Sequence, residues 1–108
     1  MDIQLTCKGI EHTEVLESHI NKQCERIIRF LQHERSPVTI EIVLEGHPNH
    51  AHNEVHIHII TPSYEVNVHR EGQKLYPVLD EVLKIAYDML HKEKEHHVHD
   101  RKQGNHRP

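Results

Sequence analysis

Hydrophobic residues recur at three- and four-residue steps in two segments of the chain, which predicts two amphipathic helices. The first helix starts after Thr13, a residue type suited to an N-cap, and ends before Ser36 and Pro37. The second covers residues 74–95, with Pro77 near its start, where a missing N–H costs nothing. The apolar stripe of the first helix consists of Leu16, Ile20, Cys24, Ile27, Ile28 and Leu31. The stripe of the second consists of Leu75, Val78, Leu79, Val82, Leu83, Ala86, Met89 and Leu90.

Four further segments alternate apolar and polar residues with a period of two, which predicts strands with one buried face each. These strands are residues 2–7, 38–45, 54–60 and 64–69. In the first strand, Ile3, Leu5 and Cys7 form the face that is expected to be buried. Residues 46–53 are predicted to form a hairpin loop, and residues 61–63 a tighter turn.

The predicted order is β-α-β-β-β-α, and it indicates an α+β fold. A strand, a helix and a second strand favour a parallel pair with a right-handed crossover, and the later strands should form antiparallel hairpins. Because every strand is apolar on one face only, both helices should cover the same side of a four-stranded mixed sheet, in two layers. We expect one domain over residues 1–97, followed by a polar, disordered tail over residues 98–108.

Composition sets further bounds. The chain has 108 residues, which is enough for one domain with one core. No apolar run approaches the roughly 20 residues that span a bilayer, and the N-terminus lacks the pattern of a signal peptide. Cys7 and Cys24 lie on apolar faces, so we expect buried free thiols, which suit the cytoplasm.

The charge of the chain depends strongly on pH. Its formal net charge is −4 with histidine neutral, which does not by itself indicate a nucleic-acid binder. The chain also has 14 histidines, and protonating all of them would bring the formal charge to −4 + 14 = +10. Since histidine titrates near pH 6.5, the sign of the surface is sensitive to pH around neutrality.

Several segments carry a resemblance to a known family. They are the opening strand Ile3-Gln-Leu-Thr with Gly9 after it, Thr13-Glu14 with Leu16 at the first helix, Leu75-Tyr-Pro-Val-Leu-Asp80 at the start of the last helix, and Lys92 with Lys94 near its end. In this order and spacing, from residue 1 to about residue 96, the chain resembles the ribosome hibernation-promoting factors. These proteins are also called ribosome-associated translation inhibitors or sigma-54 modulation proteins. The chain looks like a short form of that family.

The resemblance implies a cytoplasmic protein that is made in stationary phase or stress and binds the ribosome. It would occupy the small-subunit channel used by tRNA and mRNA, and it would inhibit translation without catalysis. Basic residues of the helices would contact phosphates of ribosomal RNA, since neutralising phosphates releases condensed counterions. The RNA-binding candidates are Lys22, Arg26, Arg29, Lys84, His91, Lys92 and Lys94. The sequence departs from the family's basic pattern at Glu17, Gln23, Ile85 and Asp88.

The histidines suggest an alternative function, the binding of Zn²⁺ or Ni²⁺. His56 and His58 should project from one face of a strand, beside Glu54, and imidazoles at i and i+2 can chelate such ions. His50 and His52 lie in the adjoining predicted loop. The spacing matches no structural zinc motif, so we expect no resident metal or other cofactor.

Enzymes and membrane proteins are disfavoured. The sequence holds no nucleophile–base pattern and no phosphate-binding glycine loop, so we expect neither catalysis nor a small-molecule substrate. No membrane partner is indicated. A third possibility is a divergent relative that keeps the fold and binds a protein through the exposed face of its sheet.

Overall fold

The structure is a computed structural model that describes the backbone of residues 1–105 and the side chains of residues 1–47 and 49–96. It has the predicted order β-α-β-β-β-α, with one short 3-10 helix, η1, between the second and third strands. The elements are β1 (Asp2–Lys8), α1 (Glu14–Leu31), β2 (Thr39–His47), η1 (Pro48–His50), β3 (His52–Ile60), β4 (Glu65–Gly72) and α2 (Leu75–Asn105). The Thr13 hydroxyl caps α1 by accepting a hydrogen bond from the Leu16 N–H at 3.1 Å.

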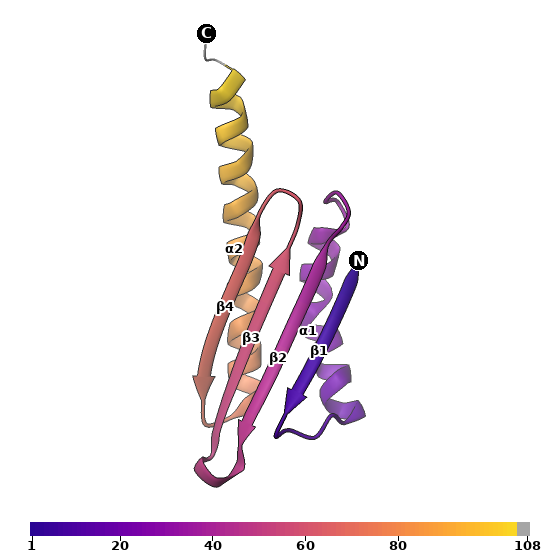
Figure 1. Ribbon diagram of the computed structural model, residues 1–108, viewed down its shortest axis with the longest axis vertical. Coiled ribbons are helices and arrows are strands. Elements are labelled where there is room, and N and C mark those ends of the chain that lie inside the picture. The colour runs from indigo at the N-terminus through magenta and orange to yellow at the C-terminus, as the bar shows by residue number, and fades with distance from the viewer. Residues whose placement is uncertain (106–108) are drawn as a thin grey trace.

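The strands form one sheet in the order β1-β2-β3-β4. β1 pairs in parallel with β2, and the other two pairs are antiparallel, as the sequence predicts. Both helices lie on the same face of this sheet, α1 behind β1 and β2 and α2 behind β3 and β4 (Figure 1). The fold is therefore a two-layer α+β sandwich with one covered face and one open face.

The core lies between the sheet and the helices. On β2 and β3, the residues at alternate positions are almost fully buried, and they meet across the strand pair as Ile40 with Ile59, Ile42 with Ile57, and Leu44 with Val55. From the helix side the core receives Leu16, Ile20, Cys24, Ile27, Leu31, Val78, Leu79, Val82, Leu83, Ala86 and Leu90. These are nearly the two stripes predicted from the sequence. Met89, Leu75 and Ile28 differ in being only partly buried.

The predicted burial of the apolar face of β1 is wrong for Ile3. Ile3 remains 48 % exposed, whereas Leu5 and Cys7 are partly buried. β1 is an edge strand with a neighbour on one side only. Its helix-side face lies at the margin of the helix layer, so two-residue alternation does not guarantee full burial there.

The loop between β2 and β3 is shorter than predicted. Antiparallel pairing continues through Gly46 with Asn53 and His47 with His52, so His52 belongs to a strand and not to the loop. The turn itself consists of η1 and Ala51, which adopts a left-handed conformation with φ 45°. The polar composition suggested a loop, but strand pairing also satisfies the backbone and leaves polar side chains on the open face.

The last helix is longer than predicted. α2 continues past residue 95 to Asn105 and extends beyond the end of the sheet (Figure 1). The sequence contains no proline after Pro77 and no glycine before Gly104 in this helix, so nothing in the chain stops it earlier. The expected tail of residues 98–108 thus overlaps the helix up to residue 105, and residues 106–108 lie outside the described residues. The disorder of this tail stays a prediction. Within the described part of the chain, no helix is long and apolar enough to cross a membrane.

Both cysteines are free thiols, as expected, although only Cys24 is fully buried. Burial raises the pKa of the Cys24 thiol from 9.0 to about 11, and it raises the pKa of the Cys7 thiol as well. Burial disfavours the charged thiolate, so the native state holds the Cys24 proton more tightly than the unfolded chain does. The stability that this adds is fully present below pH 9 and is lost as the pH rises towards 11.

A pair of identical substitutions tests the difference between the centre and the edge of the sheet. Ile57 is fully buried and Ile3 is 48 % exposed. We expect Ile57→Ala to lower the free energy of unfolding by about 2–5 kcal/mol, because it leaves a cavity in the core. Ile3→Ala should cost less than about 1 kcal/mol, within the range of strand propensity. Urea denaturation measures both, and equal losses would contradict the assignment of β1 to a poorly covered edge.

Thiol labelling tests the burial of Cys24. A pKa raised from 9.0 to about 11 lowers the thiolate fraction near pH 8 about 100-fold, and the thiolate is the reactive form. The Cys7→Ala variant retains Cys24 as its one thiol. We expect this thiol to react with a disulfide reagent at least about 100-fold more slowly than an unburied thiol. Cys24→Ala, which retains Cys7, should react faster, and both variants should react alike in urea. Equal native rates would show that Cys24 is accessible.

Candidate nucleic-acid interface

The two helices lie side by side and run in the same direction. Near their starts, Nε2 of His19 on α1 lies 2.7 Å from Oδ1 of Asp80 on α2, and the His19 ring meets the Tyr76 ring edge-on at 4.7 Å. Near the end of α1, the centres of the Phe30 and His91 rings are 4.6 Å apart. This parallel arrangement follows from the topology, since α1 follows β1 and α2 follows β4, two strands of the same direction, and each helix turns back along the sheet (Figure 1).

A hollow of about 340 Å³ lies between the helices, lined by Arg26, Arg29, Phe30, His33 and Tyr87. The Arg26 guanidinium stacks 4.5 Å from the centre of the Tyr87 ring, a cation–π contact that fixes the arginine between the helices. Arg26, Arg29 and His33 are exposed. The hollow therefore presents arginines and a histidine to solvent above an aromatic floor.

Arg29 is only weakly held within the protein. Its guanidinium lies 3.2 Å from the Glu25 carboxylate one turn earlier on α1, and both side chains are about two-thirds exposed. An exposed i,i+4 pair of this kind contributes little to stability. Arg29 can therefore exchange Glu25 for an external anion at small cost.

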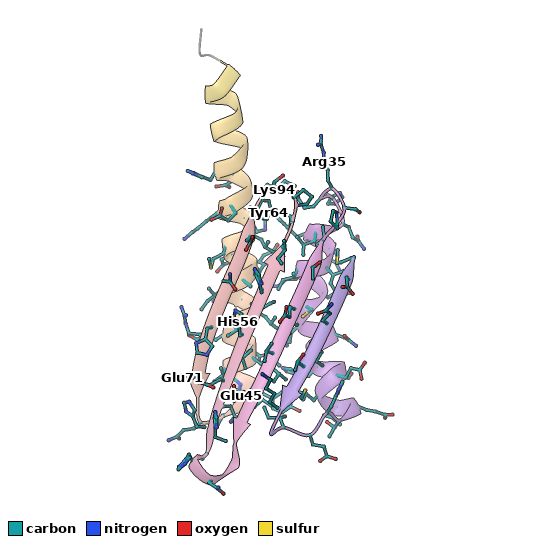
Figure 2. The ribbon with its side chains drawn as sticks, viewed as in Figure 1. Arg35, Glu45, His56, Tyr64, Glu71 and Lys94 are labelled. Atoms are coloured by element: carbon teal, nitrogen blue, oxygen red, sulfur yellow. The ribbon has the colours of Figure 1, made fainter. Side chains whose placement is uncertain are left out.

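Lys94, in contrast, is part of the scaffold. Its ammonium lies 3.1 Å from the Glu34 carboxylate and 5.2 Å from the centre of the Phe30 ring. The Tyr64 hydroxyl donates a hydrogen bond to the same Glu34 oxygen at 3.0 Å. Burial, and secondarily the Glu34 carboxylate, raise the pKa of Tyr64 well above its ordinary value. Figure 2 shows Lys94 and Tyr64 together at one end of the sheet, where both contact Glu34 and so link α2 and the turn before β4 to the segment after α1.

The structure brings only some of the sequence-predicted RNA-binding residues together. Arg26 and Arg29 line the hollow, and the His91 ring packs against the Phe30 and Tyr87 rings that form its floor. Three further candidates do not line the hollow but are exposed on the same helices: Lys22, Lys84 and Lys92. Lys94 differs from them in its ion pair with Glu34, a carboxylate that is largely buried.

The positions that depart from the basic family pattern are not equivalent. Ile85 is partly buried and packs against the core, so its place on α2 is not free for a phosphate-binding cation. Glu17 and Asp88 are exposed and add negative charge to the helices, and Glu17 lies 3.4 Å from His12. Gln23 is partly buried. The helix surface is thus mixed in charge, and its clearest cationic feature is the hollow.

Sequence reasoning missed Phe30, His33 and Tyr87. His33 follows Arg26 and Arg29 at helical spacing, seven residues after Arg26, which is a signal that the sequence does contain. Phe30 and Tyr87 flank the apolar stripes, and their meeting depends on how α1 packs against α2. No pattern within one helix shows this contact.

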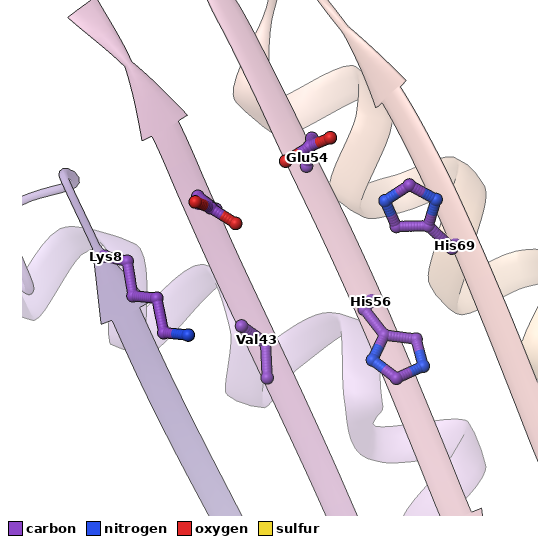
Figure 3. A pocket seen from close by; sticks show the side chains of 6 residues that line it. Lys8, Val43, Glu54, His56 and His69 are labelled. Atoms are coloured by element: carbon purple, nitrogen blue, oxygen red, sulfur yellow. The ribbon is translucent and has the colours of Figure 1, made fainter.

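The opposite, open face of the sheet is rich in histidine and glutamate. Figure 3 shows a second hollow there, of about 470 Å³, lined by Lys8, Val43, Glu45, Glu54, His56 and His69. The pKa of the Glu54 carboxyl is lowered, chiefly because this group forms a hydrogen bond with His47. Most of the imidazoles on this face lie within hydrogen-bonding distance of a polar side chain on a neighbouring strand.

His56 and His58 do share the open face, as predicted, but they do not converge on one point. Nε2 of His56 lies 2.9 Å from the Asn67 side-chain oxygen, and Nε2 of His58 lies 3.0 Å from the Glu65 carboxylate. Among the described residues, the groups of three potential ligands with closely spaced ligand atoms do not include either histidine. The pair alone is therefore a poor metal site.

A matched pair of substitutions separates scaffold from surface on α2. Lys94→Gln removes the cation beside Glu34, whose side chain is 13 % exposed, and should lower the free energy of unfolding by about 1 kcal/mol. Lys92→Gln, at an exposed position on the same helix, should leave it unchanged within about 0.5 kcal/mol. Urea denaturation of both variants measures the difference, and equal stabilities would show that the Lys94–Glu34 pair contributes nothing.

Comparison with known proteins places this geometry in context. The sequence matches the family model described as sigma 54 modulation protein / S30EA ribosomal protein over residues 3–98. No curated protein matches the sequence significantly. Among solved structures, the fold is similar to the N-terminal domain of Protein Y from Thermus thermophilus, with 19 % identity, a TM-score of 0.65, and coverage of 82 % of this chain and 94 % of that one.

A ribosomal subunit interface protein from Coxiella burnetii is also similar, with 19 % identity and a TM-score of 0.69. This match covers 88 % of the present chain and 99 % of the Coxiella chain. At this identity the two structures show a shared fold, and they agree with the α+β architecture predicted from the sequence. The family model covers most of the chain, and the protein therefore belongs to the ribosome-associated family of sigma 54 modulation proteins and S30EA ribosomal proteins.

Proposed function

We propose that this protein binds the ribosome in the cytoplasm and inhibits translation by occupying the small-subunit channel used by tRNA and mRNA. It acts by occupancy and not by catalysis, and its role belongs to stationary phase or stress. Family membership supports the ribosome as the partner. The name of the Coxiella protein, a ribosomal subunit interface protein, supports the same partner.

The hollow between the helices is the observation that carries the proposal. It gathers Arg26, Arg29 and His33 around the Phe30 and Tyr87 rings. Arginine suits phosphate because its planar guanidinium donates two parallel hydrogen bonds to an anion. The stacking of Arg26 on Tyr87 holds one guanidinium in place before binding, so less conformational entropy is lost when a phosphate is bound.

The partner surface is expected to be RNA backbone rather than base edges. Ribosomal RNA presents closely spaced phosphates, and each cation that neutralises one releases condensed counterions. In a double-stranded region, proteins recognise RNA mainly through its shape and its phosphates. Lys22, Lys84 and Lys92 are exposed on the same two helices and extend the cationic surface beyond the hollow.

The negative charge of the chain makes the location of these cations decisive. With a formal net charge of −4, the molecule as a whole does not attract RNA, so binding depends on one surface facing the phosphates. The carboxylates of Glu45, Glu54 and Glu71 cluster on the open face of the sheet, away from the helices. The two faces of the sandwich thus differ in character, and RNA binding is assigned to the helix side.

Removing the two arginines tests the proposal. We expect Arg26→Gln with Arg29→Gln to weaken co-sedimentation with ribosomes and with isolated small subunits. Measured across salt concentrations, the slope of log affinity against log salt should decrease by about 0.7–0.9 for each phosphate that the variant no longer neutralises. The unmodified protein should bind in a salt-sensitive manner.

Lys8→Glu is the matched control, because it changes the net charge by the same two units on the opposite face. It should leave ribosome binding unchanged if contact is made through the helices. Equal weakening in both variants would point to a general charge effect and contradict the assigned surface. Absence of binding by the unmodified protein at low salt would contradict the function itself.

A further inference from the structure

A second group of side chains at one end of the open face has no role in the proposed ribosome contact. The strand register places His47 opposite His52 and Glu45 opposite Glu54, and it places Glu54 opposite Glu71. These pairs lie next to the turn formed by η1 and Ala51. Figure 2 shows Glu45 and Glu71 near this end of the sheet.

The potential ligand atoms of these residues are close together. Glu45, His47 and Glu54 form one group, and His52, Glu54 and Glu71 form another, with all ligand atoms in each group within 4.8 Å of one another. Glu54 belongs to both groups. Its carboxylate is therefore within reach of both imidazoles.

One imidazole–carboxylate contact in each group has the spacing of two neighbouring ligands on a tetrahedral metal ion. Bonds of about 2.0–2.2 Å from Zn²⁺ to nitrogen and oxygen place neighbouring ligands about 3.3–3.5 Å apart. Nε2 of His47 lies 3.3 Å from the Glu54 oxygen, and Nε2 of His52 lies 3.2 Å from the Glu71 oxygen. The His47 and His52 ring centres are 5.7 Å apart, against about 5 Å for two imidazoles on one tetrahedral ion. The two groups share Glu54 only, so both nitrogens reach one ion after rotation of the side chains.

The surroundings favour a dication. Three carboxylates meet here, whereas the cation on the neighbouring strand is Lys8, opposite Glu45. The side chains of His47, His52 and Glu54 are between 28 % and 39 % exposed, so an ion can reach them and they can rotate. A mixed set of imidazole and carboxylate ligands suits Zn²⁺ and its neighbours in the first transition row, whereas Mg²⁺ prefers oxygen ligands and water.

We propose that His47, His52 and Glu54 form a binding site for a transition-metal dication of the Zn²⁺ type on the open face of the sheet. Glu45 or Glu71, or a water molecule, completes the coordination. The site differs from the pair His56 and His58 that the sequence suggests. It exists because β2 and β3 continue to His47 and His52 and so place the two imidazoles opposite each other.

Calorimetric titration of the full chain with Zn²⁺ tests this site. We expect one ion per chain at the tightest step, and no comparable binding of Mg²⁺. His47→Gln with His52→Gln should weaken that step by about tenfold or more, and Glu54→Gln should weaken it as well. The matched control, His56→Gln with His58→Gln, removes the same number of imidazoles from the same face and should leave the tightest step within about twofold of the unmodified protein.

A second measurement uses the unmodified protein and does not depend on the folding of any variant. Substoichiometric Zn²⁺ should shift the NMR signals of His47 and His52 first, ahead of those of His56, His58 and the histidines at the end of α2. Weak binding to several sites, with equal losses in the two double variants or with first shifts at the end of α2, would show adventitious chelation only and would overturn the proposal.

Discussion

The structure depends on the burial of one face of a four-stranded sheet. On β2 and β3 every second residue is apolar, and Ile42, Leu44 and Ile57 show how completely these positions are covered, at 0 % exposure each. Removing this much apolar surface from water supplies the main favourable term in folding. It also requires both helices to lie on the same side, because the other face of each strand carries polar residues. The division of the molecule into a helix side and an open side follows from that one requirement.

The two sides can therefore carry separate chemistry. On the helix side, α1 and α2 run in the same direction, and their facing flanks place Arg26 beside Tyr87 and Phe30 beside His91. On the open side, strand register places imidazoles beside carboxylates, for example His58 beside Glu65. Since a sheet of one layer separates the two surfaces, the proposed RNA contact and the proposed metal site do not compete for the same side chains.

The scaffold also decides which cations are available. Lys94 is held by Glu34 and covers Phe30, whereas Arg29 pairs only with the exposed Glu25. Arg29 lies in the last turn of α1, where positive charge complements the helix dipole, whereas Lys94 lies about three turns before the end of α2. Burial of the partner makes the difference, because a carboxylate that is largely removed from water needs its counterion more than an exposed one does.

The sequence by itself determined the order of the elements, the two-layer architecture, the apolar stripes and the family resemblance, because hydrophobic periodicity reports directly which face of each element is buried. It also pointed to Arg26 and Arg29. It did not determine the exposure of Ile3 or the pairing of His47 with His52, since these depend on sheet edges and strand register. The length of α2 was underestimated although the sequence shows no stop signal before Gly104. Only the tertiary structure placed Arg26 over Tyr87 and His47 beside Glu54, because the first contact joins two helices far apart along the chain and the second joins two neighbouring strands.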